Sequence, residues 1–140
     1  MTLHANDIKI GDSYEEEICD NLSRTQIVMY AGASGDYNPL HSDEIFTKEV
    51  AGYPSVFAHG MLSMGMTGRM LTNFVGDGRL KYYGVRFTAQ VFPGATLRAK
   101  ATITDIRDEN GEKIADLEVS TTNQEGIEVI KGKASARLDQ

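Results

Sequence analysis

The segment from His59 to Val75 constrains the fold of this chain most strongly. It carries one certain charge, on Arg69, and its apolar side chains point to nearly every side of a helix. A helix of this kind is predicted to be buried almost all round. Gly65 and Gly68 each lower its helix propensity by about 1 kcal/mol relative to alanine, so their small size indicates close approach by a sheet, another helix or a ligand.

Alternating apolar residues fill the half of the chain that follows this helix. Turn signals at Pro93-Gly94, at Asn110-Gly111 and from Asn123 to Gly126 indicate hairpins, and therefore antiparallel pairing of consecutive strands. One buried helix and a run of hairpins predict an α+β domain in which an antiparallel sheet wraps around the long helix. The expected strands cover residues 85–91, 97–103, 115–119 and 134–138.

The first third of the chain predicts shorter elements. A strand is expected near Ser13 to Cys19. The segment Ser23–Gln26 has the pattern of a capping box, and the helix that it starts is expected to end at Gly32 and Gly35. After a loop, Ser42 is expected to cap a further short helix.

Composition favours a single domain. With 140 residues and 41% hydrophobic content, residues 1–140 can build one core without metal or disulfide support, and no repeat or linker divides them. The single cysteine, Cys19, cannot form an internal disulfide or a multi-cysteine metal site. Acidic neighbours, among them Glu17 and Asp20, would raise the pKa of its thiol, which predicts an unreactive cysteine.

The net charge and the distribution of Lys and Arg indicate which classes of partner to expect. The formal net charge is −6 and no stretch gathers Lys and Arg, so nucleic acid is not an expected partner. The N-terminus has neither a basic segment nor a long apolar one, and the longest apolar stretch, around Phe57 to Val75, is interrupted by polar residues. We therefore expect a cytoplasmic protein that does not associate with a membrane.

Two short motifs carry chemistry. Asp36 and His41 flank an Asn38-Pro39 turn, and an acid and an imidazole held in this way can activate one water together. Gly60 follows His59 at the start of the predicted helix, where its N–H has no intrahelical acceptor and suits a developing oxyanion. By itself the Asp36 turn would indicate an ordinary loop. Together with His41 and Gly60 it predicts an enzyme.

Three parts of the sequence carry a family resemblance: Tyr30–His41, Ala58–Leu62, and Gly84–Phe87 with Val91–Gly94. They resemble the MaoC-like family of R-specific enoyl hydratases (hydratase 2), and most of all its small single-hot-dog members, including subunits of 3-hydroxyacyl-thioester dehydratases. The resemblance covers most of the chain. It implies a single hot-dog domain and a hydro-lyase that reversibly hydrates trans-2-enoyl thioesters to R-3-hydroxyacyl thioesters, in fatty acid or related acyl metabolism.

The resemblance also implies roles for residues of the two motifs. Asp36 and His41 would form the catalytic dyad, and the sequence does not decide which is the formal base because their titrations would be coupled. The Gly60 amide would stabilise the enolate oxygen. Asn38 and His59 are expected around the substrate as orienting residues.

Other residues are assigned to the acyl chain by the same resemblance. Thr67, Gly68 and Leu71 are expected to line an acyl tunnel, with Gly68 leaving room for a longer or bulkier chain. No cofactor and no metal are expected, and a zinc site built from the three histidines of the chain is disfavoured because no metal-ligand spacing occurs.

Two alternative functions stay open: a hot-dog acyl thioesterase, and the catalytic subunit of a heteromeric 3-hydroxyacyl-ACP dehydratase. The expected partner is an acyl-CoA or acyl-carrier-protein thioester, and the expected assembly is a homodimer, with a heterodimer as the alternative. An acidic chain favours coenzyme A over an acidic carrier protein, although Arg79, Lys81, Arg86 and Arg98 could form a local basic rim. The acyl chain length is not determined by the sequence.

Overall fold

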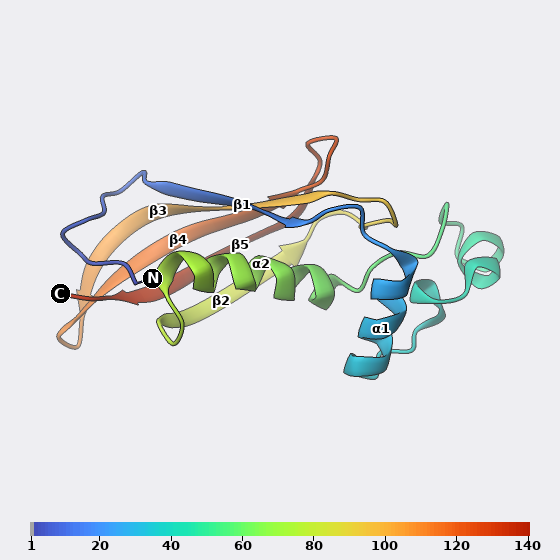
Figure 1. Ribbon diagram of the computed structural model, residues 1–140, viewed down its shortest axis with the longest axis horizontal. Coiled ribbons are helices and arrows are strands. Elements are labelled where there is room, and N and C mark those ends of the chain that lie inside the picture. The colour runs from blue at the N-terminus through green and yellow to red at the C-terminus, as the bar shows by residue number, and fades with distance from the viewer. Residues whose placement is uncertain (1) are drawn as a thin grey trace.

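A five-stranded antiparallel sheet curves around one long helix (Figure 1). The computed structural model describes residues 2–140. The elements in chain order are β1 (Ser13–Cys19), α1 (Arg24–Ser34), the helical turns η1 (Pro39–His41) and η2 (Phe46–Val50), α2 (Gly60–Val75), β2 (Leu80–Phe87), β3 (Leu97–Glu109), β4 (Glu112–Thr122) and β5 (Glu128–Leu138). This arrangement confirms the α+β class.

Helix α1 begins with the predicted capping box. The Gln26 N–H donates to the Ser23 Oγ at 3.0 Å, and the Ser23 N–H donates to the Gln26 Oε1 at 3.0 Å. The helix ends at Gly35, whose φ of 76° lies in the left-handed region that glycine adopts at low cost. Gly32 lies inside the helix, so its prediction as a terminating residue is wrong.

The short helix after the loop is capped differently from the prediction. The Ser42 N–H donates to the Pro39 carbonyl at 3.2 Å and so ends the preceding turn, η1. Asp43 takes the capping role, because its Oδ1 accepts a hydrogen bond from the Phe46 N–H at 3.0 Å. Serine and aspartate are both favoured at helix N-termini. Ser42 is taken up by the end of η1, so the capping position falls to Asp43.

Helix α2 is buried on one side only, so the prediction of burial almost all round is wrong for the single chain. The sheet covers one face of the helix and leaves a strip at four-residue spacing exposed, on which Met61 retains 57% of its accessible surface. The exposed strip is made of Met61, Gly65, Arg69 and Asn73. None of the helices within residues 2–140 combines the length and the apolar character needed to cross a bilayer.

The strand order is β1-β3-β4-β5-β2. The hairpins predicted at Asn110-Gly111 and at Asn123–Gly126 are confirmed, because β3 pairs with β4 and β4 with β5. The hairpin predicted at Pro93-Gly94 is wrong. Strand β2 ends at Phe87 and pairs with β5, so the segment 88–96 crosses from one edge of the sheet to β3 near the other edge. Strand β2 is therefore an edge strand that lies beside the last strand of the chain.

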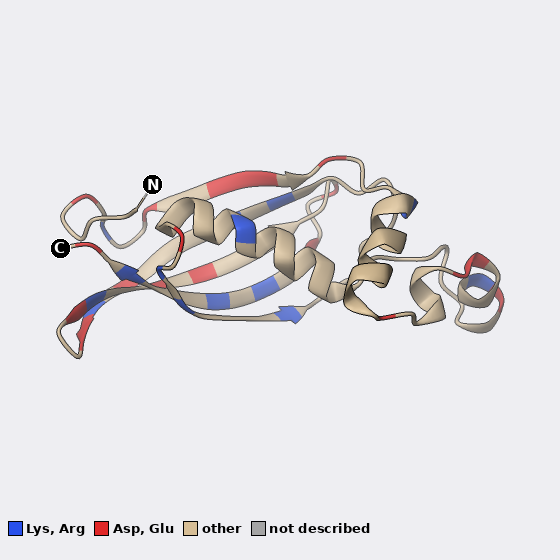
Figure 2. Cartoon of the chain, turned by 60° about the horizontal axis from the view of Figure 1, so that its bottom comes forward, with Lys and Arg blue, Asp and Glu red and all other residues tan. Residues whose placement is uncertain are grey.

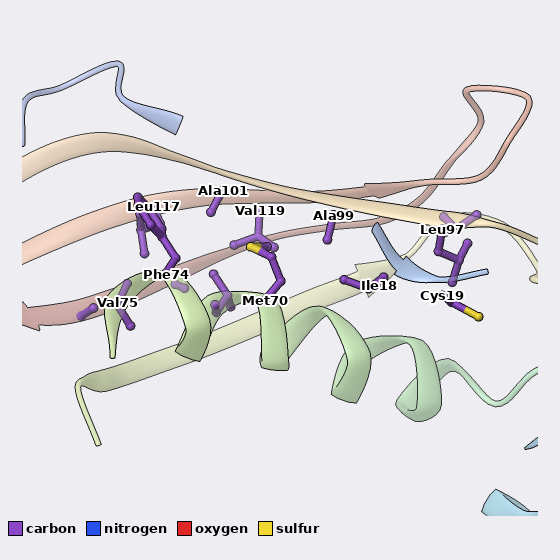
Figure 3. Packing of buried hydrophobic residues seen from close by; sticks show 14 of the residues in the cluster. Ile18, Cys19, Met70, Phe74, Val75, Leu97, Ala99, Ala101, Leu117 and Val119 are labelled. Carbon is purple, nitrogen blue, oxygen red and sulfur yellow. The ribbon is translucent and has the colours of Figure 1, made fainter. Parts of the chain in front are cut away.

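The core lies between α2 and the concave face of the sheet (Figure 3). Met70, Phe74 and Val75 of the helix face small and branched side chains of the sheet, and alanines such as Ala99 allow the helix to approach closely. Cys19 is buried at the edge of this core, and burial, followed by the charge of Asp20, raises the pKa of its thiol. Figure 2 shows charged residues on the strands of the sheet, on α2 and at loop tips.

Candidate active site

The loop that follows α1 forms a tight, internally bonded turn. The Asn38 N–H donates to the Asp36 Oδ1 at 3.2 Å, and the Asn38 Oδ1 accepts from the Leu40 N–H at 3.0 Å. Pro39, with its fixed φ, occupies the first position of η1. Asn38 thus orients the Asp36 carboxylate from within its own loop, and Pro39 rigidifies the turn that leads to His41.

His41 faces the other oxygen of the same carboxylate. Its Nε2 lies 3.9 Å from the Asp36 Oδ2, too far for a direct hydrogen bond and close enough for one water to bridge the two atoms. The His41 Nδ1 lies 2.6 Å from the Phe57 carbonyl oxygen. Because a carbonyl can only accept, Nδ1 carries a proton in this contact, and the tautomer with this proton presents its lone pair at Nε2.

The two side chains differ in exposure. The His41 side chain is 10% exposed, whereas the Asp36 carboxylate is 54% exposed. The pair therefore lies at the boundary between the interior and solvent, where water has direct access to the carboxylate side of the pair.

His59 supports both members of the pair. Its ring stacks on that of His41, with centroids 3.7 Å apart, and its Nε2 donates to the Asp36 carbonyl oxygen at 3.0 Å. The Tyr30 ring packs edge-on against the His59 ring, with centroids 4.8 Å apart. Since His59 is only 2% exposed, it orients Asp36 and His41 from beneath rather than facing the solvent side of the site.

Gly60 begins α2 directly after His59. The first amide of a helix has no intrahelical acceptor, and the helix dipole makes this end positive. A Cβ at position 60 would lie 2.8–2.9 Å from three ring atoms of Phe87, so only glycine fits here without moving that ring. A cavity of about 220 Å³ opens beside it, lined among others by Phe57, Ala58, Gly60, Ser63, Phe87 and Val129.

The three residues assigned to the acyl chain lie elsewhere on α2 and do not line this cavity. Leu71 is fully buried in the core, and the Thr67 hydroxyl bonds that of Thr121 at 2.7 Å. Gly68 does not leave open space, because a Cβ there would lie 3.2 Å from the Tyr83 ring. The Tyr83 ring therefore lies beside Gly68, and the acyl-binding roles of Thr67, Gly68 and Leu71 stay predictions.

Asp36, His41 and His59 also bring their potential ligand atoms within 4.8 Å of one another, which raises the question of a metal. An imidazole binds metal through a lone pair that lies in the ring plane, at about 2.0–2.1 Å. The His41 and His59 rings stack at 20° with centroids 3.7 Å apart, so their lone pairs lie in two nearly parallel planes that do not meet at one ion. The arrangement therefore fits proton transfer better than metal binding.

Comparisons with known proteins place this geometry in a family. The model of the MaoC like domain matches residues 5–126 of the chain. The chain belongs to the MaoC-like domain family. Among relatives of this MaoC-like chain, the (R)-specific enoyl-CoA hydratase of Rhodospirillum rubrum is 32% identical over 134 residues, which cover 94% of the chain and 89% of that protein.

A second relative is much longer than this MaoC-like chain. The 3-hydroxyacyl-thioester dehydratase Y of Mycobacterium tuberculosis is 37% identical over 89 residues, which cover 61% of the chain and 31% of that protein. The chain matches about a third or less of the length of several curated relatives.

A solved structure shows the same fold. The R-hydratase PhaJ1 of Pseudomonas aeruginosa superposes with a TM-score of 0.85 over 99% of this chain and 88% of its own, at 22% identity. The hot-dog fold that the resemblance implied for this MaoC-like chain is thereby confirmed.

Proposed function

We propose that this chain catalyses the reversible addition of water to trans-2-enoyl thioesters, giving R-3-hydroxyacyl thioesters. The observation that carries the proposal is the 3.9 Å gap between the His41 Nε2 and the Asp36 Oδ2, two atoms that both accept hydrogen bonds. A water in this gap donates both of its hydrogens and directs a lone pair outward. The (R)-specific enoyl-CoA hydratase named above, similar over nearly the whole chain, supports this reaction.

The Asp36–His41 pair can carry out the proton transfers that this reaction needs. The water oxygen bonds to Cβ of the enoyl group while the Asp36–His41 pair takes one proton from it. The π electrons of the double bond move toward the thioester, and its oxygen becomes an enolate. The pair then returns one proton to Cα, the electrons return to the C=O bond, and one water has been added in total.

The enolate oxygen needs a hydrogen-bond donor that is in place before the reaction starts. The Gly60 N–H, at the positive end of α2, supplies one. One donor of this kind contributes about 3–4 kcal/mol of transition-state stabilisation in comparable sites. The dyad and this donor act on opposite ends of the same conjugated system, at Cβ and at the thioester oxygen.

We propose coenzyme A as the carrier of the acyl group. A site for an acidic carrier protein would need free basic residues at its rim, and three of the candidates are occupied by carboxylates. Lys81 lies 2.7 Å from Glu112, Arg98 lies 3.5 Å from Glu15, and Arg79 pairs with Asp139. Arg86 is exposed on β2.

We propose further that the active form is a dimer working in the cytoplasm. Strand β2 leaves one edge of the sheet unpaired, and two large apolar side chains on it, Tyr82 and Phe87, are 59% and 50% exposed. Phe87 lies against Gly60, so a second copy at this edge would cover the cavity. Light scattering of the purified protein tests this, and full activity of a monomer would contradict it.

The test of the reaction is the loss of enoyl absorbance with crotonyl-CoA and longer enoyl-CoA substrates, with chiral analysis of the product. Asp36→Asn should lower the rate by at least about a hundredfold. Asp77→Asn, the same change in an exposed turn at the far end of α2, should leave the rate unchanged. Release of free thiol without hydration would assign a thioesterase instead. Turnover only with a carrier-protein thioester or an added partner subunit would assign a heteromeric dehydratase.

A further inference from the structure

The hydroxyl of Ser63 is a buried polar group without a hydrogen-bond partner among the described residues. Ser63 is 2% exposed on α2, and its Oγ has no hydrogen-bond partner within residues 2–140. The large majority of buried side-chain oxygens in folded proteins are hydrogen-bonded, so an exception calls for a functional explanation.

The Ser63 side chain lies on the same side of α2 as Gly60. The two residues are three apart, which places them one above the other on a helix, and both line the cavity of about 220 Å³. Helical side chains tilt toward the N-terminus, so the Ser63 hydroxyl lies over the turn that Gly60 begins. Ser63 and Gly60 therefore border one space, and the Ser63 hydroxyl is buried at its wall.

Neighbouring hydroxyls differ from that of Ser63, because they are already bonded within the fold. Thr88, which lines the same cavity, donates from its Oγ1 to the Glu128 carbonyl at 2.7 Å. Thr67, one turn further along α2, shares a 2.7 Å hydrogen bond with Thr121. Of these three hydroxyls, that of Ser63 can therefore donate its hydrogen to a group that enters the cavity.

We propose that Ser63 donates, through its Oγ, a second hydrogen bond to the thioester oxygen of the substrate, beside the bond from the Gly60 N–H. This assignment rests on the proposed hydration reaction. The thioester oxygen is a weak acceptor in the substrate and carries negative charge in the enolate, so the Ser63 bond strengthens as the transition state forms. Its loss should therefore lower kcat and leave KM nearly unchanged.

The experiment compares Ser63→Ala with the wild type in kcat, KM and Tm on crotonyl-CoA. We expect a loss of about tenfold to hundredfold in kcat, with KM and Tm close to the wild-type values. Ser63→Thr, which retains a hydroxyl, should recover most of the lost rate. Ser135→Ala makes the same change at a buried serine of β5, away from the cavity, and should retain the wild-type kcat.

Each outcome decides a separate point. A wild type that hydrates crotonyl-CoA, together with a Ser63→Ala variant of equal kcat, overturns the role of Ser63 and leaves the proposed function intact. A loss of rate accompanied by a lowered Tm, or shared by Ser135→Ala, also overturns it, because it reflects a structural effect. A wild type without hydratase activity on CoA and carrier-protein thioesters overturns the proposed function and this role with it.

Discussion

The imidazole of His59 stacks on that of His41, with ring planes 20° apart and centroids 3.7 Å apart. His59 also donates from Nε2 to the backbone carbonyl of Asp36, while its Nδ1 is buried without a partner in the part of the chain that the structure describes. One ring thus fixes the position of both catalytic candidates, through a ring face and through a single N–H.

These two contributions of His59 can be separated by substitution. His59→Phe keeps a flat ring under His41 and removes the N–H donor, whereas His59→Gln keeps a donor and removes the ring. We expect both proteins to fold and both to lose about tenfold to hundredfold in kcat, since small displacements of reacting groups have effects of this size. Steady-state kinetics with melting temperatures check this. Wild-type kcat in both variants would show that His59 does not position the pair.

Gly60 and Phe87 form a second testable pair. In Gly60→Ala the new methyl group would meet the Phe87 ring at 2.8–2.9 Å. We expect a loss of activity and a lower Tm, because the ring must move and the cavity beside it changes shape. The double variant Gly60→Ala/Phe87→Ala removes the clash and should recover stability relative to Gly60→Ala. A double-mutant cycle on Tm measures this coupling, and strictly additive effects would contradict it.

Two glycines of α2 should differ in their response to alanine. A Cβ at Gly65 meets no atom within 4 Å, so Gly65→Ala should stabilise the fold by about 0.5–1 kcal/mol through helix propensity. A Cβ at Gly68 lies 3.2 Å from the Tyr83 ring, so Gly68→Ala should gain less or lose stability. Urea unfolding of the two variants gives the comparison. Equal stabilisation by both would show that the Tyr83 ring moves freely.

Tyr83 should give the stability of the protein a dependence on alkaline pH. Burial raises the pKa of its phenol from 10.0 to about 12, with a smaller opposing effect from the nearby Thr67 hydroxyl, and the phenol donates to the Met64 carbonyl at 2.8 Å. The folded state therefore retains a proton that the unfolded chain loses first. The stabilising contribution of this group is complete below pH 10 and is lost as the pH rises to about 12. Tyrosinate absorbance and unfolding measurements at these pH values test this, with Tyr83→Phe expected to lack the corresponding phase.

Local patterns predicted the local structure well. The capping box at Ser23 and the turns at Asn110-Gly111 and Asn123–Gly126 each depend on neighbouring residues, and all three are confirmed. The hairpin predicted at Pro93-Gly94 is wrong because the choice of a strand's partner is not local. Pairing of β2 with β5 joins residues about fifty positions apart, and no feature of the turn at 93–94 encodes it.

In the candidate site, too, the sequence shows what is local and misses contacts between distant segments. Asp36, Asn38 and His41 share one turn, and the sequence shows their spacing directly. The carbonyl of Phe57, which fixes the tautomer of His41, is a backbone group that no side-chain motif marks. Ser63 could have been noticed as a polar residue on an otherwise apolar helix, but only the structure shows that its hydroxyl is unbonded.

Figure 1 shows α1 and the residues that follow it extending beyond the end of the sheet, at the Gly60 end of α2. Asp36 and His41 lie on this extension, while Gly60 and Ser63 begin the helix that the sheet enfolds. Local melting of the extension would therefore separate Asp36 and His41 from Gly60 and Ser63 before any strand is lost. Heating should abolish catalysis at a lower temperature than it abolishes the sheet, and cooling from that intermediate range should restore it.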